Sequence, residues 1–160
     1  MRAAPPSELD RQAVARLLGR QPRGDWEVAV RGPGGGPVVI WNAPVLEDGT
    51  PMPTSYWLVG RTEREAVSRL EAAGGVKAAE AAVDASELQA AHRAYEAART
   101  AAIVGHEEGP LPSAGVGGTR QGVKCLHAHL AWYLAGGDDP VGRWTALELG
   151  ISLSSYQVVG

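Results

Sequence analysis

The sequence predicts a small α+β domain, a three-stranded antiparallel sheet packed against several helices, and three observations indicate this fold class. Two short stretches of β-forming residues are joined by a glycine-rich turn. Segments with helical apolar spacing and capping residues lie on both sides of them. The chain has 160 residues, 44% hydrophobic and 21% charged, which is typical of a globular domain. We therefore expect residues 1–160 to form a single domain.

The N-terminal part of the chain contains the first helix and the predicted sheet. Ser7 is suited to cap a helix within residues 1–20. The stretch DWEVAVR, residues 25–31, alternates like a half-buried strand, and PVVIW, residues 37–41, is its predicted antiparallel partner across the turn GPGGG. After a proline-rich loop, the apolar run YWLV, residues 56–59, predicts the third strand.

Two helices are expected after the sheet. Thr62 and Glu65 have the spacing of a capping box. Asp84 precedes a second helix, whose apolar stripe includes His92. Buried polar side chains are usually hydrogen-bonded, so we interpret His92 as a hydrogen-bonded histidine at the edge of the core.

The end of the chain is predicted to be helical as well. Asp139, followed by a proline, is suited to cap a short helix that buries Trp144 and Leu147. Residues 151–160 form either a further strand or a mobile tail.

Charge, hydropathy and cysteine content exclude several classes of protein. A net charge of -3 gives no whole-chain reason for binding nucleic acid. No stretch approaches the roughly 18 apolar residues of a membrane span, and the N-terminus lacks the apolar run of a signal peptide. The single cysteine, Cys125, cannot form an intramolecular disulfide. We expect a cytoplasmic protein that binds neither nucleic acid nor membranes.

The stretch GVGGTRQGVKCLHAHLAWYLAGG, residues 115–137, is the expected functional site. A helix over residues 120–135 would place its apolar residues on one buried face. These residues are Val123, Leu126, Leu130, Tyr133 and Leu134. His127 and His129 would flank that face on opposite sides, so a regular helix does not let them share a metal ion.

A glycine-rich loop precedes one basic edge of this predicted helix. Free backbone N–H groups, the helix dipole and nearby cations together favour anions. We therefore predict a site for a phosphate-like or carboxylate ligand, in which His127 binds the anion or donates a proton. Its residues are Gly117, Gly118, Thr119, Arg120, Lys124 and His127. The alternative is a loop followed by cations that are merely solvated.

Cys125 and His129 share the other edge and suggest two further chemistries. Thiolate and imidazole suit zinc or iron, with His106 as a candidate for another ligand. Too few soft ligands remain in a chain with one cysteine, however, so we expect no bound cofactor. Cys125 could instead be a catalytic nucleophile, with His129 or His127 as further catalytic candidates. Whether the protein is an enzyme stays open.

A third hypothesis is a non-enzymatic module that binds a protein partner. Trp132, near the edge with Cys125 and His129, would be exposed in such a module. The loop PMPTSYW, residues 51–57, would form the rest of its surface.

Several motifs together resemble the actinobacterial domain of unknown function 501 family. They are KCLHAH followed by DPVG, with LEDGTPMPTSYWL and SRLEAAGGV, and the resemblance runs roughly from Trp26 to Gly142. It implies no particular activity. It does imply cysteines at two positions that are Gly32 and Gly60 in this chain, and their absence counts against a metal cluster around Cys125.

Overall fold

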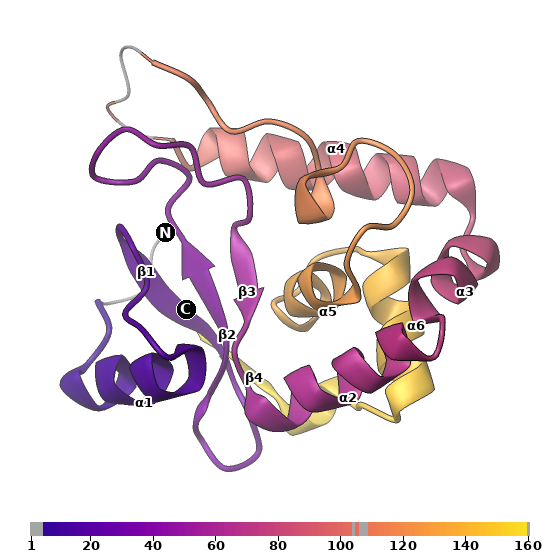
Figure 1. Cartoon of the computed structure of the whole chain (residues 1–160), viewed down its shortest axis with the longest axis horizontal. Helices are drawn as coiled ribbons and strands as arrows, with labels where there is room; N and C mark the ends of the chain where they lie inside the picture. Colours follow the sequence, from indigo (N-terminus) through magenta and orange to yellow (C-terminus); the bar gives the residue numbers. More distant parts are fainter. Residues whose placement is uncertain (1–4, 104, 106–108, 160) are drawn as a thin grey trace.

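The structure is a computed structural model that describes residues 5–103, 105 and 109–159 (Figure 1). Within these ranges it has an open four-stranded antiparallel sheet of order β3-β2-β1-β4 and six α-helices. The strands are β1 (Trp26–Arg31), β2 (Pro37–Asn42), β3 (Tyr56–Leu58) and β4 (Gln157–Val158). The helices are α1 (Glu8–Leu18), α2 (Arg61–Ala72), α3 (Gly75–Ala82), α4 (Ala85–Ala101), α5 (Leu126–Leu134) and α6 (Pro140–Leu149). The α+β class is confirmed, whereas the predicted number of three strands is wrong.

The additional strand is β4, near the C-terminal end, within the segment for which a further strand was one of the two expectations. β4 pairs with β1, and the N–H of Val159 donates to the carbonyl of Ala29 at 2.9 Å. The hydroxyl of Tyr156 donates to Oε2 of Glu63 at 2.8 Å. β4 itself has two exposed residues, so no alternation of buried and exposed residues marks it in the sequence.

An irregularity at Ala29 in β1 separates two of the three clusters that make up the core. Val28 pairs with Ile40 whereas Val30 pairs with Val39, so two residues of β1 oppose one residue of β2 in a β-bulge. Strict alternation would place Val28 and Val30 on the same face. Instead they belong to different clusters, one beneath α1 and one beneath α2–α6. The buried residues of the α1 cluster are Val14, Trp26, Val28, Ile40 and Val59.

Three of the predicted helix caps are confirmed and one is wrong. Ser7 Oγ accepts the N–H of Asp10 at 3.1 Å, and the Asp84 and Asp139 carboxylates accept N–H groups of their own first turns. The capping box of Thr62 and Glu65 is absent, because α2 begins at Arg61 directly after Gly60. These three caps are local interactions, which is why sequence spacing reveals them.

The last helix and the segment after α2 also differ from the prediction. Trp144 is half-buried, but Leu147 is 74% exposed and therefore does not face the core. The short helix α3 was not predicted. It begins at Gly75, after Gly74 takes a left-handed conformation with φ +91°.

The predicted helix over residues 120–135 begins too early, because α5 starts at Leu126. Gly122 has φ +66° and Cys125 is extended, so the preceding residues form a loop. Two carboxylates of other helices hold this loop: Glu80 accepts the N–H of Val123 at 3.1 Å, and Glu71 accepts the N–H of Leu126 at 2.8 Å. The predicted burial is confirmed for Val123, Leu126, Leu130 and Leu134, while Tyr133 is half-buried.

Side chains of α4 bind both the segment just before β3 and the loop that precedes α5. The hydroxyl of Tyr95 accepts the N–H of Ser55 at 2.6 Å, just before β3. The buried Arg99 donates to the carbonyls of Pro53 at 2.8 Å and Ala114 at 2.7 Å. These bonds fix β3 and the loop before α5 relative to each other.

Candidate functional site

A cavity of about 350 Å³ lies between the end of α1, β3, the middle of α2 and the start of α5. Its wall is mostly apolar and includes one guanidinium, one imidazole, one thiol and two aliphatic hydroxyl groups. The residues that line it are Leu18, Thr54, Tyr56, Trp57, Leu58, Arg64, Ser68, Gly117, Cys125, His127 and Ala128. No carboxylate is among them. We call it the Arg64 cavity.

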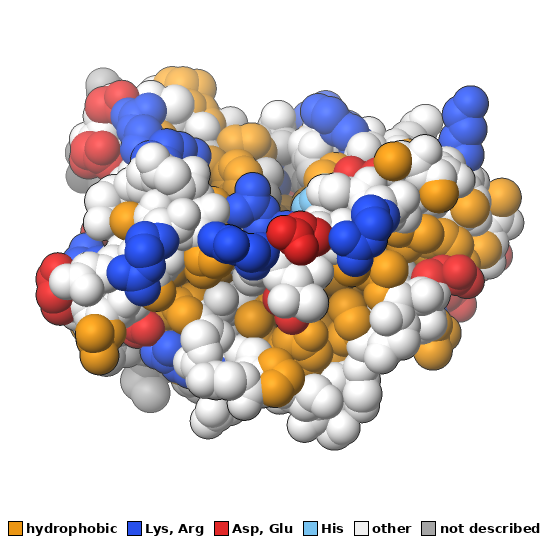
Figure 2. All heavy atoms as spheres, turned by 60° about the horizontal axis from the view of Figure 1, so that its bottom comes forward, with side chains coloured by type: hydrophobic (Ala, Val, Ile, Leu, Met, Phe, Trp, Pro, Cys, Tyr) orange, Lys and Arg blue, Asp and Glu red, His pale blue; other side chains and the backbone are white. Residues whose placement is uncertain are grey.

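Basic side chains gather on the face of the molecule that is formed by α1 and α2. Figure 2 shows Arg and Lys side chains gathered around the middle of this face, with acidic side chains and some histidine surface among them. Several of the basic residues of α1 and α2 are exposed, including Arg16 and Arg61. The protein therefore presents a local basic region although its net charge is -3.

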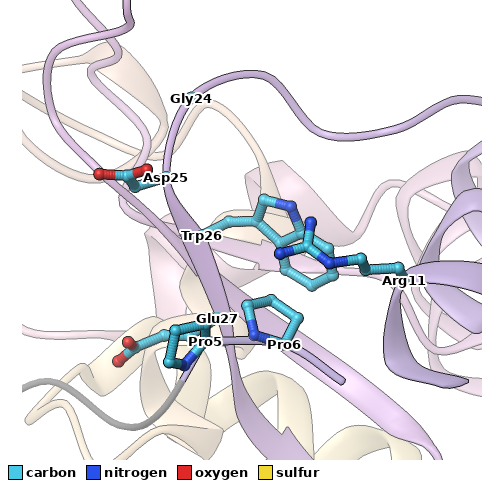
Figure 3. A pocket seen from close by; sticks show the side chains of 7 residues that line it. All are labelled: Pro5, Pro6, Arg11, Gly24, Asp25, Trp26 and Glu27. Carbon is cyan, nitrogen blue, oxygen red and sulfur yellow. The ribbon is translucent and has the colours of Figure 1, made fainter. Parts of the chain in front are cut away.

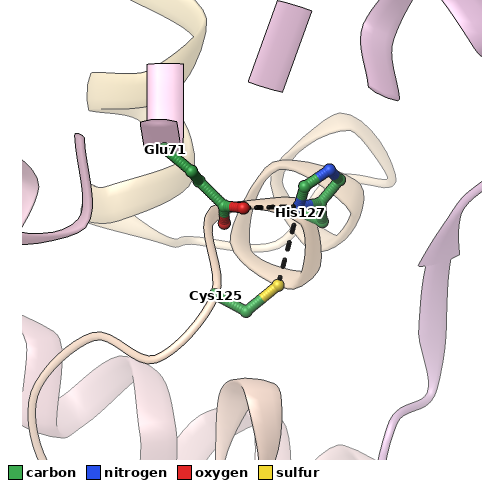
Figure 4. Close-up of side chains that lie close together, drawn as sticks. All are labelled: Glu71, Cys125 and His127. Atoms are coloured by element: carbon green, nitrogen blue, oxygen red, sulfur yellow. Dashed lines mark hydrogen bonds and ion pairs between the residues drawn. The ribbon is translucent and has the colours of Figure 1, made fainter. Parts of the chain in front are cut away.

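Glu71 joins two of the cavity residues in a cluster of three potential ligands (Figure 4). Nδ1 of His127 lies 3.3 Å from Oε1 of Glu71 and 3.8 Å from Sγ of Cys125. Nε2 of the same ring lies 3.2 Å from Oγ of Ser68. All three residues of the cluster are half-buried. Segments more than 50 residues apart in the chain thus meet here, since Glu71 belongs to α2 and the other two to the start of α5.

The thiol and the imidazole of this cluster each favour the charged form of the other. Burial raises the pKa of the Cys125 thiol, but hydrogen bonds from His127 and the N–H of Ala128 outweigh it, so the pKa is lower than usual. The hydrogen bond with Cys125 raises the pKa of His127, burial opposes this, and Glu71 adds to the increase. The cluster is therefore suited to hold a thiolate.

The geometry differs from that of a nucleophile–histidine–carboxylate triad. In such a triad the nucleophile and the carboxylate contact different nitrogens of the ring, so that one nitrogen takes a proton while the other is oriented. Here Cys125 and Glu71 both face Nδ1 of His127, and Nε2 faces a serine hydroxyl. Glu71 does not orient the ring from the far side.

Comparison with known proteins places the chain in a family. A family model described as "Protein of unknown function (DUF501)" matches residues 28–147. The chain belongs to this family. The match runs from β1 to α6 and includes most of the cavity wall, and it confirms the resemblance seen in the sequence. The description names no activity. No curated protein and no solved structure matches the chain.

Only two residues of the predicted anion site line the Arg64 cavity, namely Gly117 and His127. Arg120 and Lys124 are exposed and do not line it. Gly118 and Thr119 are also absent from its wall; the Thr119 hydroxyl instead donates to the carbonyl of Gln121 at 2.8 Å. Lys124 lies beside the glycine-rich loop, since a Cβ added at Gly118 would be 3.9 Å from its Nζ.

Several N–H groups of the loop that we expected to be free are hydrogen-bonded within the protein. The N–H of Gly115 donates to the carbonyl of Thr119 at 2.9 Å, and that of Val116 donates to Nδ1 of His92 at 3.0 Å. Nε2 of His92 lies 2.9 Å from the carbonyl of Gly122. The interpretation of His92 as a hydrogen-bonded histidine is confirmed.

The predicted pairing of Cys125 with His129 is wrong, because Cys125 interacts with His127 instead. His129 is fully buried, its Nδ1 lies 2.6 Å from Oδ2 of Asp139, and its ring packs edge-on against His92. The pairing assumed a helix through residue 125, whereas Cys125 precedes α5 in an extended conformation. His106 lies outside the described residues.

The positions at which the family resemblance implies cysteines lie away from Cys125. Side chains at Gly32 and at Gly60 would both meet Cγ2 of Val38, at 2.9 Å and 3.2 Å from an added Cβ. Both glycines line a separate hollow near the first hairpin. Cysteines there would neighbour each other and not the cluster at the start of α5.

One of the two parts of the predicted protein-binding surface, Trp132, is not at the surface. Trp132 is only 8% exposed and packs edge-on against Tyr95, with ring centroids 5.2 Å apart, so its predicted exposure is wrong. Trp57, in the other part, is 36% exposed and lines the Arg64 cavity.

Arg64, Ser68 and Glu71 were not predicted as site residues from the sequence. Glu71 lies in the last turn of α2, where the helix dipole disfavours a negative charge. Glu80 likewise lies in the last turn of α3. Such unfavourably placed acids indicate partners elsewhere, here the N–H groups of the loop before α5. Nothing distinguishes Arg64 from the other arginines of its helix.

A second, larger hollow of about 470 Å³ lies beside the start of β1 (Figure 3). Pro5, Pro6 and Arg11 form one side, and residues 24–27 form the other. It brings together no thiol, imidazole or hydroxyl group, and its wall reaches Pro5, where the described part of the chain begins. The Arg64 cavity is the better candidate for chemistry.

Within the described part of the chain, no helix is both long and apolar enough to cross a bilayer.

Proposed function

We propose that this protein binds a small organic anion, a carboxylate or phosphate ester with an apolar part, in the Arg64 cavity. The composition of the wall supports this proposal: Arg64 and His127 are its basic groups, no acidic side chain lines it, and apolar residues form most of the rest. Pockets for small molecules typically combine an apolar lining with a few polar groups that orient the ligand.

Arg64 is the residue best suited to bind the charged group of this ligand. Its Nη1 donates to the carbonyl of Leu17 at 2.8 Å, which holds the guanidinium at the end of α1. A guanidinium has five N–H donors in a planar fork, so this bond leaves donors for a carboxylate or phosphate. The hydroxyl groups of Thr54 and Ser68 add neutral hydrogen-bonding groups to the same wall.

Thermal unfolding of the metal-free protein tests the proposal. Phenyl phosphate and benzoate serve as anionic probes in a buffer with EDTA, and benzyl alcohol serves as the uncharged control. We expect the anions to raise the unfolding midpoint more than the alcohol, because a ligand that binds the folded state stabilises it. No shift with either anion would overturn the proposal.

Matched variants locate the site. Arg64→Gln should weaken anion binding about tenfold or more, since a hydrogen bond to a charged group contributes about 1.5–3 kcal/mol. Arg61→Gln is the control, because Arg61 is exposed on the same helix and does not line the cavity. Loss of the shift in Arg120→Ala or Lys124→Ala, with Arg64→Gln unaffected, would place the ligand at the loop and contradict the cavity site.

A further inference from the structure

Glu71, Cys125 and His127 bring a carboxylate, a thiol and an imidazole together at one edge of the Arg64 cavity (Figure 4). Their nearest ligand atoms all lie within 4.8 Å of one another. From the sequence we considered Cys125 together with His129 and expected no bound cofactor. The structure instead pairs Cys125 with His127 and adds Glu71 from α2.

Both neighbours of His127 approach the same ring nitrogen. Nδ1 lies 3.3 Å from a Glu71 oxygen and 3.8 Å from the Cys125 sulfur. A nitrogen carries either one N–H or one lone pair, so it forms one good hydrogen bond and not two. A cation between the three atoms would instead accept electron pairs from all of them. We propose that Glu71, Cys125 and His127 bind a divalent transition metal ion, with Zn²⁺ as the best fit.

The separations agree with tetrahedral coordination. Bond lengths of about 2.0–2.1 Å to nitrogen and oxygen and about 2.3 Å to sulfur place a nitrogen about 3.3 Å from an oxygen and about 3.6 Å from a sulfur. The distances from Nδ1 of His127 are 3.3 Å and 3.8 Å, respectively. Glu71 and Cys125 are therefore each spaced from His127 as ligands of one ion would be, and their own ligand atoms lie within 4.8 Å of each other.

Two of the ligands are oriented by neighbours in the way that metal ligands usually are. Metal-bound histidines donate their other ring N–H to a nearby acceptor, and Nε2 of His127 lies 3.2 Å from Oγ of Ser68. The second carboxylate oxygen of Glu71 accepts the N–H of Leu126 at 2.8 Å, which leaves the first oxygen directed at His127.

The ligand types select the ion. Thiolate and imidazole favour zinc and similar transition metals, whereas magnesium and calcium prefer sites made of oxygen ligands. Three protein ligands with a fourth position open are typical of zinc sites that act on a substrate. Cys125 and His127 both line the Arg64 cavity, so the open position faces the space assigned above to an organic anion. This last point rests on the proposed function, but the metal site itself does not.

Cobalt substitution gives a direct test with untagged protein. Co²⁺ is added to the EDTA-treated and dialysed protein, and the absorption spectrum is recorded. We expect a thiolate-to-cobalt charge-transfer band and the intense visible bands of tetrahedral Co²⁺, both reversed by one equivalent of Zn²⁺. Cys125→Ser should remove the charge-transfer band. Absence of that band in the wild type would overturn the proposal.

Competition with a chelator then measures Zn²⁺ affinity in paired variants. Glu71→Gln should weaken binding at least tenfold, since its amide oxygen can still accept the N–H of Leu126 but is a poor zinc ligand. Glu80→Gln is the control, because Glu80 holds the N–H of Val123 from the equivalent turn of α3 and lies outside the cluster. Circular dichroism of the metal-free variants checks that each is folded.

Equal Zn²⁺ affinity in the wild type and in Glu71→Gln and Cys125→Ser would place any bound ion elsewhere and overturn the site. The anion experiments above are carried out in EDTA, so they succeed or fail independently of the metal. Anion binding without Zn²⁺ binding would refute only the metal site. Zn²⁺ binding without an anion effect would refute only the proposed function.

Discussion

At the scale of single residues, His92 is a neutral histidine held by both of its ring nitrogens. Nδ1 accepts the N–H of Val116, so Nε2 carries the proton and donates it to the carbonyl of Gly122. Burial lowers the pKa of His92, the hydrogen bond to Gly122 opposes this, and the nearby His129 lowers it further, while Asp139 raises it slightly. Protonation of Nδ1 would place an N–H of His92 against the N–H of Val116 and would break this hydrogen bond.

Acidification should therefore weaken the fold through His92. In the unfolded chain the histidine has its ordinary pKa of about 6.5 and binds a proton before the folded protein does. The contribution of His92 to stability should fall as the pH drops below about 6.5, by up to about 1.4 kcal/mol per pH unit for one proton. His127, whose pKa is raised in the folded protein, acts in the opposite direction, so the effect of His92 is read from the difference between wild type and variant. Urea unfolding between about pH 7.5 and pH 5.5 measures this.

His92→Asn provides the comparison. The variant should be less stable at neutral pH, because it loses one of the two hydrogen bonds, but it should lose less stability on acidification. Parallel pH profiles of wild type and variant would show that other groups cause the dependence.

At the scale of elements, the sequence could predict what depends on neighbouring residues. Ser7, Asp84 and Asp139 cap helices by accepting N–H groups only two or three residues further along the chain. The alternation of buried and half-buried residues in β1 follows the alternation of apolar residues in its sequence. The start of α5 could not be predicted in this way, because Glu71 bonds the N–H of Leu126 across 55 residues. The predicted site was wrong for the same reason, because a helix that includes residue 125 places Cys125 and His129 on the same edge.

Other differences have the same physical origin. The bulge at Ala29 depends on the pairing of β1 with β2, and β4 depends on a free edge of β1, so neither has a local pattern. The Arg64 cavity combines residues of α1, β3, α2 and α5, which only the tertiary fold brings together. His127 and Gly117 were predicted because they belong to one glycine- and histidine-rich stretch.

The attachment of β4 can be tested through Tyr156. Its hydroxyl donates to the mostly buried carboxylate of Glu63, so Tyr156→Phe leaves that carboxylate without this partner. We expect the free energy of unfolding to decrease by about 1–3 kcal/mol, the cost of an unsatisfied buried acceptor. Tyr133→Phe is the control, since the Tyr133 hydroxyl has no hydrogen bond within the described part of the chain. Equal midpoints in urea for Tyr156→Phe and wild type would contradict this role.

At the scale of the whole molecule, one sheet contributes residues to two of the three apolar clusters, which differ in size. In the smaller α1 cluster, helix α1 is attached to the sheet by the buried side chain of Val14. The ion pair of Asp10 with Arg31, whose nearest atoms are 2.8 Å apart, is a second attachment. Both clusters share β1 and β2. We therefore expect them to unfold together in a single transition.

Val14→Ala tests this cooperativity. Removing part of a fully buried valine should cost about 2 kcal/mol. Far-ultraviolet circular dichroism and the slowest amide exchange in α5 should report the same decrease. Unchanged exchange in α5 would mean that α1 detaches by itself and that the clusters are independent.

Trp57 stands apart from the other four tryptophans, because only its side chain is exposed, and it does so at the wall of the Arg64 cavity. Its indole N–H donates to the carbonyl of Thr54 at 3.1 Å, which holds the ring in place. An indole in contact with water emits at longer wavelength than a buried one. Trp57 therefore contributes to the long-wavelength part of the intrinsic fluorescence. Any molecule that displaces water from the cavity will change this emission, so the protein carries its own optical sensor of occupancy.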